Sequence, residues 1–176
     1  MNLDAMHERH RGLTPSQAGG YQEAAAVCLS RHHSPPTPVT LSDNGGESST
    51  LVSWTVPDDR MQDAWANRTD TTEAGAYGCV LAAVELLRSL VAVRRAEAGT
   101  GADYYIGPPG AGVNDLEDCI RLEVAGVDAG NARDLARLLS RKVEQARAGR
   151  SSLPAVAGVI GFATGVLMLR DVRETP

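Results

Sequence analysis

Lys142 is the only lysine among the 17 lysine and arginine residues of the chain, and the other sixteen are arginines. The position of this lysine calls for a chemical explanation. An apolar stripe that contains Leu135 and Leu139 predicts a helix over 132–148, and Lys142 lies on the same stripe. The ammonium therefore faces whatever the helix packs on. It then requires acidic partners, because an unpaired buried charge is costly. The alternative is a lysine at the edge of the stripe, with its stem on apolar surface and its head in water.

Glu73 and Asp103 are candidate acidic partners that come earlier in the chain. Glu73 begins the apolar stripe of a helix predicted over 70–95, so the helical spacing directs its side chain inward. Alternatively, Glu73 closes a capping box with Asp70 at the start of that helix. Asp103 lies in a strand predicted over 102–106, where alternation directs it to one face.

Glu123 is a further candidate, because it is a carboxylate in the middle of an apolar strand predicted over 119–127. It shares one face of that strand with Arg121 and Ala125, and the opposite face is apolar. If this were an edge strand, a solvated outer face would accommodate Glu123 cheaply.

Carboxylate oxygens that converge on one point form a hard oxygen site, which suits Mg²⁺ or Mn²⁺. Such a metal polarises a phosphoryl oxygen and lowers the pKa of a bound water, while a nearby ammonium stabilises charge in the transition state. In this chemistry Asp103 and Glu123 are metal ligands, and Glu73 is a third or water-mediated ligand. Lys142 supplies the ammonium, and Gln145 supplies a positioning donor.

The N-terminal part of the chain predicts one helix and one β-hairpin. A proline in the first turn and an alanine-rich stretch predict a helix over 15–31. Strands over 38–42 and 50–56 flank an Asp-Asn-Gly-Gly sequence, which favours a tight turn. We therefore expect residues 1–68 to form an extension that packs on a core at 69–176.

An uncharged run over 151–169 lies near the C-terminus, and this part of the chain predicts two adjacent buried strands over 155–163 and 166–172. Pro154 and a Thr-Gly step interrupt a helix there, and the β-branched residues favour a pleated surface. A short membrane-spanning helix is the alternative, since the run approaches the length of a span. We expect the strands and no membrane contact.

The amino-acid composition further limits the classes of protein to which the chain can belong. A chain of 176 residues that is 43% hydrophobic can bury one sizeable core, and its net charge of −5 provides no global basic field for nucleic acid. Three widely spaced cysteines without a C-x-x-C pair predict reduced thiols. The acidic, histidine-containing N-terminus lacks the order of a signal peptide, so a cytoplasmic protein is expected. Four histidines, His7, His10, His32 and His33, lack zinc-protease spacing and are expected to be free.

The order of these elements and acids resembles the PD-(D/E)XK nuclease superfamily. The stretches T-G-A-D-Y-Y-I-G and C-I-R-L-E-V-A-G supply its strand acids as Asp103 and Glu123. The family lysine two residues after the second acid is Ala125 here. The superfamily tolerates migration of that lysine to the following helix, where S-R-K-V-E-Q contains Lys142. Gln145, one turn later, resembles the glutamine of the RecB-like branch.

The resemblance implies an α/β fold in which helices flank a mixed β-sheet, with a restriction-endonuclease-like αβββαβ core. It implies a Mg²⁺- or Mn²⁺-dependent phosphodiester hydrolase that acts on nucleic acid. The expected metal ligands are Glu73, Asp103 and Glu123, and the expected catalytic residues are Asp103, Glu123, Lys142 and Gln145. Ala125 and the acidic net charge favour an alternative, a catalytically inactive nuclease-like fold that binds a protein partner in a multiprotein system.

Overall fold

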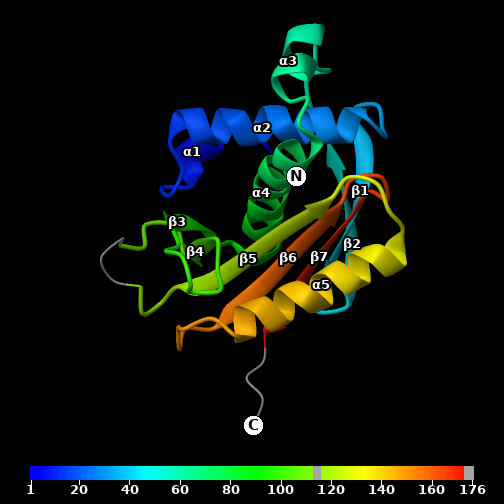
Figure 1. Ribbon diagram of the computed structural model, residues 1–176. Helices are drawn as coiled ribbons and strands as arrows, with labels where there is room; N and C mark the ends of the chain where they lie inside the picture. The colour runs from blue at the N-terminus through cyan, green and yellow to red at the C-terminus, as the bar shows by residue number, and fades with distance from the viewer. Residues whose placement is uncertain (113–115, 173–176) are drawn as a thin grey trace.

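Helices alternate with strands along the computed structural model, which describes residues 1–112 and 116–172. Its helices are α1 (Met6–Arg9), α2 (Pro15–Ser30), α3 (Asp59–Ala64), α4 (Arg68–Arg88) and α5 (Ala132–Arg147). Its strands are β1 (Thr37–Asp43), β2 (Gly46–Val52), β3 (Val91–Arg95), β4 (Tyr104–Gly107), β5 (Ile120–Val127), β6 (Ala155–Gly161) and β7 (Val166–Val172). Within the described residues these strands form one mixed sheet in the order β2-β1-β7-β6-β5-β4-β3 (Figure 1). The fold is therefore α/β, as predicted.

The part of the sheet that follows α4 begins with an antiparallel meander. β3 pairs with β4 and β4 pairs with β5, both antiparallel, and α5 then leads to β6, which lies parallel to β5. The order from α4 to β6 is thus helix, three-stranded meander, helix and strand. β7 returns antiparallel to β6, and β1 pairs with β7 in parallel, so the β1–β2 hairpin extends the same sheet.

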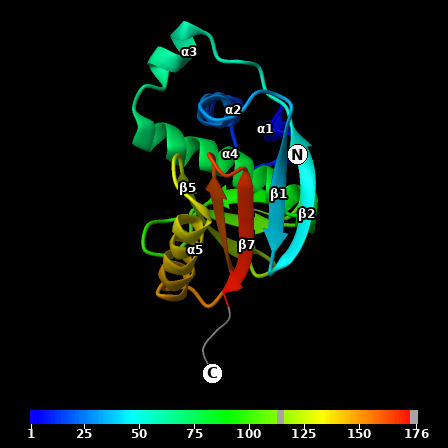
Figure 2. The same cartoon turned by 90° about the vertical axis from the view of Figure 1, so that its right-hand side faces the viewer.

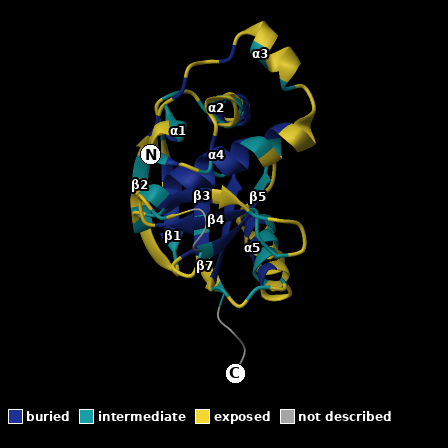
Figure 3. Ribbon diagram, turned by 90° about the vertical axis from the view of Figure 1, so that its left-hand side faces the viewer, coloured by how far each residue is buried: buried dark blue, intermediate teal, exposed yellow. Residues whose placement is uncertain are grey.

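The sheet has a hydrophobic core on each face because the side chains of its strands alternate. Leu122 belongs to the core cluster beneath α4, whereas its near neighbour Ala125 packs against the cluster beneath α5. α4, with α2 stacked upon it, therefore covers one face, and α5 covers the other (Figure 2). The middle of α4 is buried between α2 and the sheet (Figure 3).

Two glycines allow α2 and α4 to approach backbone to backbone. A Cβ at Gly75 would lie 3.1 Å from the backbone of Ala24, and one at Gly78 would lie 3.0 Å from the carbonyl oxygen of Tyr21. These distances leave no space for a larger side chain. Close packing against α2 therefore holds α4 in place over the sheet.

The prediction of a helix over 70–95 is wrong about where the helix ends. α4 ends at Arg88, Ser89 adopts a left-handed conformation with φ of 55°, and β3 (Val91–Arg95) follows. A left-handed residue ends an α-helix, and the β-branched valines that follow suit a strand. The apolar spacing continued through this turn, so the sequence alone did not reveal the break.

The start of α4 also differs from the prediction, because Asn67 is its N-cap. The Asn67 side chain accepts hydrogen bonds from the backbone N–H groups of Thr69 and Asp70. A capping box between Asp70 and Glu73 is therefore not formed. Glu73 is exposed rather than at the start of the buried face, and its carboxylate is available to other side chains.

The predicted hairpin and the two C-terminal strands are confirmed. β1 and β2 are joined at the Asp-Asn-Gly-Gly turn, although β2 begins at Gly46, earlier than expected. β6 and β7 pair across the Thr-Gly step. In residues 1–112 and 116–172, no helix combines the length and apolar character that a membrane span needs.

His10 is buried, which contradicts the expectation of a free histidine. Its Nδ1 accepts a hydrogen bond of 3.0 Å from the backbone N–H of Ala92 in β3. Its Nε2 lies 3.1 Å from an oxygen of Glu85, which also pairs with Arg9. Because Nδ1 is an acceptor, the neutral ring carries its proton on Nε2 and donates it to Glu85. The imidazole thus ties the N-terminal segment to an edge of the sheet.

We expect this contact to make folding stability depend on pH. Burial lowers the pKa of His10 below its ordinary value of 6.5. The unfolded chain therefore takes up a proton at a higher pH than the folded chain, so stability is lost as pH falls below about 6.5. The free energy of unfolding, measured in urea between pH 7.5 and 5, should fall with pH in the wild type. In His10→Asn it should fall less steeply. The control His7→Asn should retain the wild-type slope, and an unchanged slope in His10→Asn would contradict this assignment.

Candidate active site

A cleft of about 710 Å³ opens where β4 stops pairing with β5. β4 pairs with β5 only as far as Leu122, and in the described chain no strand follows that edge of β5 onward to Val127. The open edge of β5 forms the floor of the cleft. Its polar lining comes from α4, β5, α5 and the residue before β4: Arg68, Thr69, Thr72, Glu73, Tyr77, Asp103, Glu123, Asp128, Lys142 and Gln145.

Asp103 and Glu123 lie side by side in the cleft because of the strand register. Tyr104 pairs with Leu122 in an antiparallel ladder, which sets Asp103, one residue before β4, opposite Glu123. The Asp103 backbone N–H donates to the carbonyl of Leu122, and its side-chain Oδ2 accepts a 2.8 Å hydrogen bond from the N–H of Val124. Asp103 thus lies beside β5 near Glu123, although it precedes β4, whereas the strand predicted over 102–106 included it.

Lys142 faces Glu123, as the helical spacing predicts. Its Nζ lies 2.6 Å from Glu123 Oε1 and donates a second hydrogen bond of 3.2 Å to Gln145 Oε1. The Glu123 side chain is only 3% exposed and the Lys142 side chain 20%. The alternatives of a solvated Glu123 and of a lysine head directed to water are thus wrong.

The environment of Glu123 opposes its ionisation. Burial raises its pKa, and the nearby Asp103 carboxylate raises it further, whereas Lys142 lowers it. The net direction is upward, so Lys142 compensates only part of the cost. A second positive charge close to these carboxylates would therefore be favourable.

Tyr77 links two of the predicted acids, although it was not singled out from the sequence. Its hydroxyl lies 2.9 Å from Glu73 Oε1 and 2.8 Å from Asp103 Oδ1. A phenol has one proton, so it donates to one carboxylate at a time or shares the proton between them. Burial and the Asp103 charge raise the pKa of Tyr77 well above its ordinary value, so the hydroxyl stays protonated. Its spacing of four residues from Glu73 was the available signal.

Arg95 is the second residue that sequence reasoning missed, because it was assigned to the end of a helix. It ends β3, and its guanidinium donates a 3.0 Å hydrogen bond to the Tyr77 hydroxyl and lies 3.7 Å from Asp103. It also lies over the rings of Tyr77 and Tyr104, 4.4 and 4.7 Å from their centroids. Arg95 therefore supplies a cation beside Asp103, and its charge, like that of Lys142, opposes the upward shift that burial causes in the pKa of Glu123.

Arg121 holds the strand and the helix of the site together. Its guanidinium is buried and donates to the carbonyl of Ala146 at the end of α5 and to that of Thr100 before β4, both at 2.8 Å. It also donates to the carbonyl of Leu153 before β6. Because Arg121 is two residues from Glu123, these bonds fix the position of α5, and hence of Lys142, relative to the strand.

The predicted metal site stays a prediction, although its three acids, Glu73, Asp103 and Glu123, all line the cleft. Among the described residues, no group of three histidine, cysteine or acidic side chains is placed to hold a metal ion. The Tyr77 hydroxyl lies between Glu73 and Asp103. Asp103 and Glu123 remain as a hard oxygen pair. Such a pair is chemically suited to Mg²⁺, which often binds through one or two carboxylates and keeps several waters.

Comparisons of the chain with protein-family models, with curated proteins and with solved structures found no match.

Proposed function

We propose that the protein is a metal-dependent phosphodiester hydrolase that acts on nucleic acid. The observation that carries this proposal is the convergence of Asp103, Glu123 and Lys142 in one cleft, with Gln145 and Glu73 at its walls. Two adjacent carboxylates beside an ammonium are the groups that metal-assisted phosphoryl chemistry requires. The order of α4, the three-stranded meander, α5 and β6 supports the resemblance to the PD-(D/E)XK superfamily.

In this proposal Asp103 and Glu123 would hold Mg²⁺ or Mn²⁺, and Glu73 would be a third or water-mediated ligand. The metal supplies polarisation of a phosphoryl oxygen and a more acidic water when it is bound. Lys142 donates to a non-bridging phosphate oxygen, where it stabilises the charge that develops as the phosphodiester is attacked. Gln145 accepts from Lys142 and so fixes the direction of the ammonium.

A second function is favoured by Arg95 and Tyr77, which both contact Asp103. Together with Lys142 they supply cationic and hydrogen-bonding partners for the strand carboxylates without a metal. Ala125 also stands where the superfamily has its usual lysine. These features fit a nuclease-like domain that has lost catalysis and binds a protein partner in a larger assembly.

Metal binding to the folded protein distinguishes the two functions. A ligand at ten times its Kd stabilises the native state by about 1.4 kcal/mol, which corresponds to a rise in Tm of about 4 °C for a chain of this size. We expect Mg²⁺ and Mn²⁺ to raise the Tm of the wild type but not of Asp103→Asn. Glu144→Gln is the matched control, because Glu144 is an exposed acid on α5 outside the cleft lining. If neither metal raises the wild-type Tm more than that of Asp103→Asn, the hydrolase proposal fails.

A further inference from the structure

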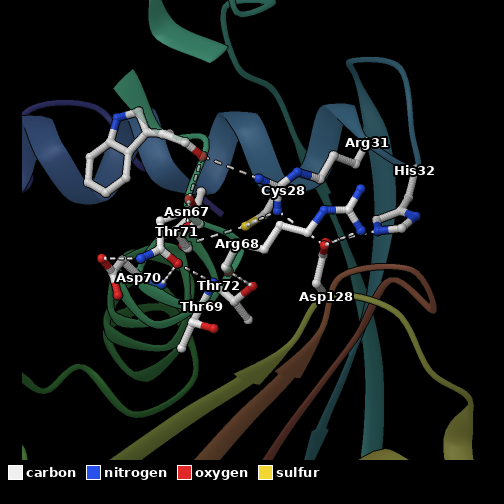
Figure 4. A network of polar contacts seen from close by, with 11 residues as sticks. Cys28, Arg31, His32, Asn67, Arg68, Thr69, Asp70, Thr71, Thr72 and Asp128 are labelled. Atoms are coloured by element: carbon white, nitrogen blue, oxygen red, sulfur yellow. Dashed lines mark hydrogen bonds and ion pairs between the residues drawn. The ribbon is translucent and has the colours of Figure 1, made fainter. Parts of the chain in front are cut away.

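A basic cluster borders the same cleft, which two of its members, Arg68 and Asp128, line. It consists of Arg31 and His32 after α2 and Arg68 at the start of α4, gathered around Asp128 after β5 (Figure 4). The cluster brings together three segments that are distant in sequence, and the acidic site is built without Arg31, His32 or Arg68. The cluster therefore requires its own explanation.

The cluster has more cationic groups than its carboxylate can neutralise. Arg31 Nη1 lies 3.1 Å from one oxygen of Asp128, and His32 Nε2 lies 3.0 Å from the other. Both oxygens of Asp128 thus already have close partners. Arg68 Nη1 approaches only to 3.9 Å, and its side chain is 75% exposed. A contact of this kind contributes little to stability, so folding does not account for Arg68.

The surroundings of Arg68 differ from those of an ordinary solvated arginine. Arg31 is held behind it, with a side chain only 19% exposed and a further hydrogen bond to the carbonyl of Trp65. Arg68 lines the cleft that contains Glu123 and Lys142, and the hydroxyl-bearing Thr69 and Thr72 line it beside Arg68. The guanidinium is thus an exposed donor in a concave surface. A planar fork of N–H groups matches the oxygens of a phosphate.

The spacing of the two charged ends is compatible with a polymeric ligand. Glu123 and Asp128 are five residues apart along β5, a span of about 16 Å at ~3.3 Å per residue. This span is several times the ~3.4 Å by which the phosphates of a duplex strand advance along the axis, and it is also longer than one nucleotide of an extended single strand. A single nucleotide cannot reach from one end to the other.

We propose that Arg68 binds a backbone phosphate of a nucleic-acid strand more than one nucleotide away from the phosphate that contacts Lys142. Arg31 and His32 hold Asp128, and Asp128 in turn limits the positions that Arg68 can adopt. The identity of the polyanion as nucleic acid rests on the proposed hydrolase function. The presence of the anion subsite itself rests on the cluster and the cleft.

Fluorescence anisotropy with labelled single-stranded oligonucleotides in the presence of a chelator tests this proposal without cleavage. We expect the wild type to bind a nine-nucleotide strand at least about tenfold more tightly than a dinucleotide, because only the longer one reaches Arg68. Arg68→Gln should remove most of that advantage in affinity. It should also lower the slope of log Kd against the logarithm of the salt concentration by about 0.7, the value for one phosphate contact on a single strand. The matched control is Arg170→Gln, an exposed arginine on β7 outside the cleft, which should retain the advantage.

Three results would overturn the subsite: no binding of the longer strand by the wild type, equal losses in Arg68→Gln and Arg170→Gln, or equal affinity for an oligoglutamate of the same charge. The metal titration distinguishes this failure from failure of the hydrolase proposal. If metals do not stabilise the protein but the length advantage depends on Arg68, the hydrolase proposal fails and the anion subsite stands. If metals stabilise the protein and Arg68→Gln has no effect, only the subsite is lost.

Discussion

Lys142→Ala is expected to lower Mg²⁺-dependent cleavage of a nucleic-acid substrate by about a hundredfold or more while the fold is retained. Lys142 is the cation in direct contact with Glu123, so its removal leaves no ammonium at that side of the cleft. Loss of one preorganised group that stabilises developing charge typically has an effect of about this size. Lys142→Arg should not restore the rate fully, because a planar guanidinium does not occupy the position of a compact ammonium.

Single-turnover rates at saturating metal measure this effect, with circular dichroism to verify folding. Arg141→Ala is the matched control, since Arg141 precedes Lys142 on α5 but is exposed and outside the cleft lining. We expect its rate to remain within about twofold of the wild type. A Lys142→Ala rate as high as that of Arg141→Ala would contradict the role assigned to Lys142.

Lys142→Met is expected to destabilise the protein by about 3 kcal/mol at pH 7, because it leaves the buried Glu123 carboxylate without its cation. The double variant Glu123→Gln/Lys142→Met should recover much of this loss, since a neutral amide needs no counter-charge. The difference in free energy of unfolding between wild type and Lys142→Met should also become smaller as pH falls toward 5. Without Lys142 the pKa of Glu123 rises further, and protonation then removes the buried charge.

Urea unfolding of the wild type, both single variants and the double variant measures this coupling at pH 7 and pH 5. Additive effects of the two substitutions would show that the pair contributes no interaction energy. That outcome would contradict the conclusion that Lys142 and Glu123 stabilise one another. Added Mg²⁺ should restore part of the stability of Lys142→Met if Asp103 and Glu123 bind it, because the metal binds only the native state.

The pairing of Lys142 with Glu123 could be predicted from the sequence because both residues break an apolar pattern. A lysine on a leucine stripe and a glutamate in a valine- and leucine-rich strand each need a partner, and the helix and strand were assigned nearly correctly. The register that brings Asp103 beside Glu123 followed once both strands were assigned. Local periodicity was sufficient for these elements.

The rest of the site depends on contacts that periodicity does not encode. Arg95 was missed because the apolar spacing continues through the left-handed Ser89, where the helix ends. The Tyr77 hydroxyl lies between Glu73 and Asp103 only because α4 packs over the sheet at that position. Each of the three predicted acids lines the cleft, and their joint binding of a metal stays a prediction.

The most direct test of the proposed function is cleavage by the wild type and by Asp103→Asn from parallel preparations, with Mn²⁺ or with a chelator. Single-stranded DNA, duplex DNA and RNA should be assayed separately, because the proposed function does not specify which of these nucleic acids is the substrate. We predict metal-dependent cleavage of at least one substrate by the wild type. The rate for Asp103→Asn should be lower by a factor of at least about one hundred. Cleavage at equal rates by both proteins, or cleavage of no substrate by the wild type, would contradict the assignment of Asp103, Glu123 and Lys142 as a hydrolytic site.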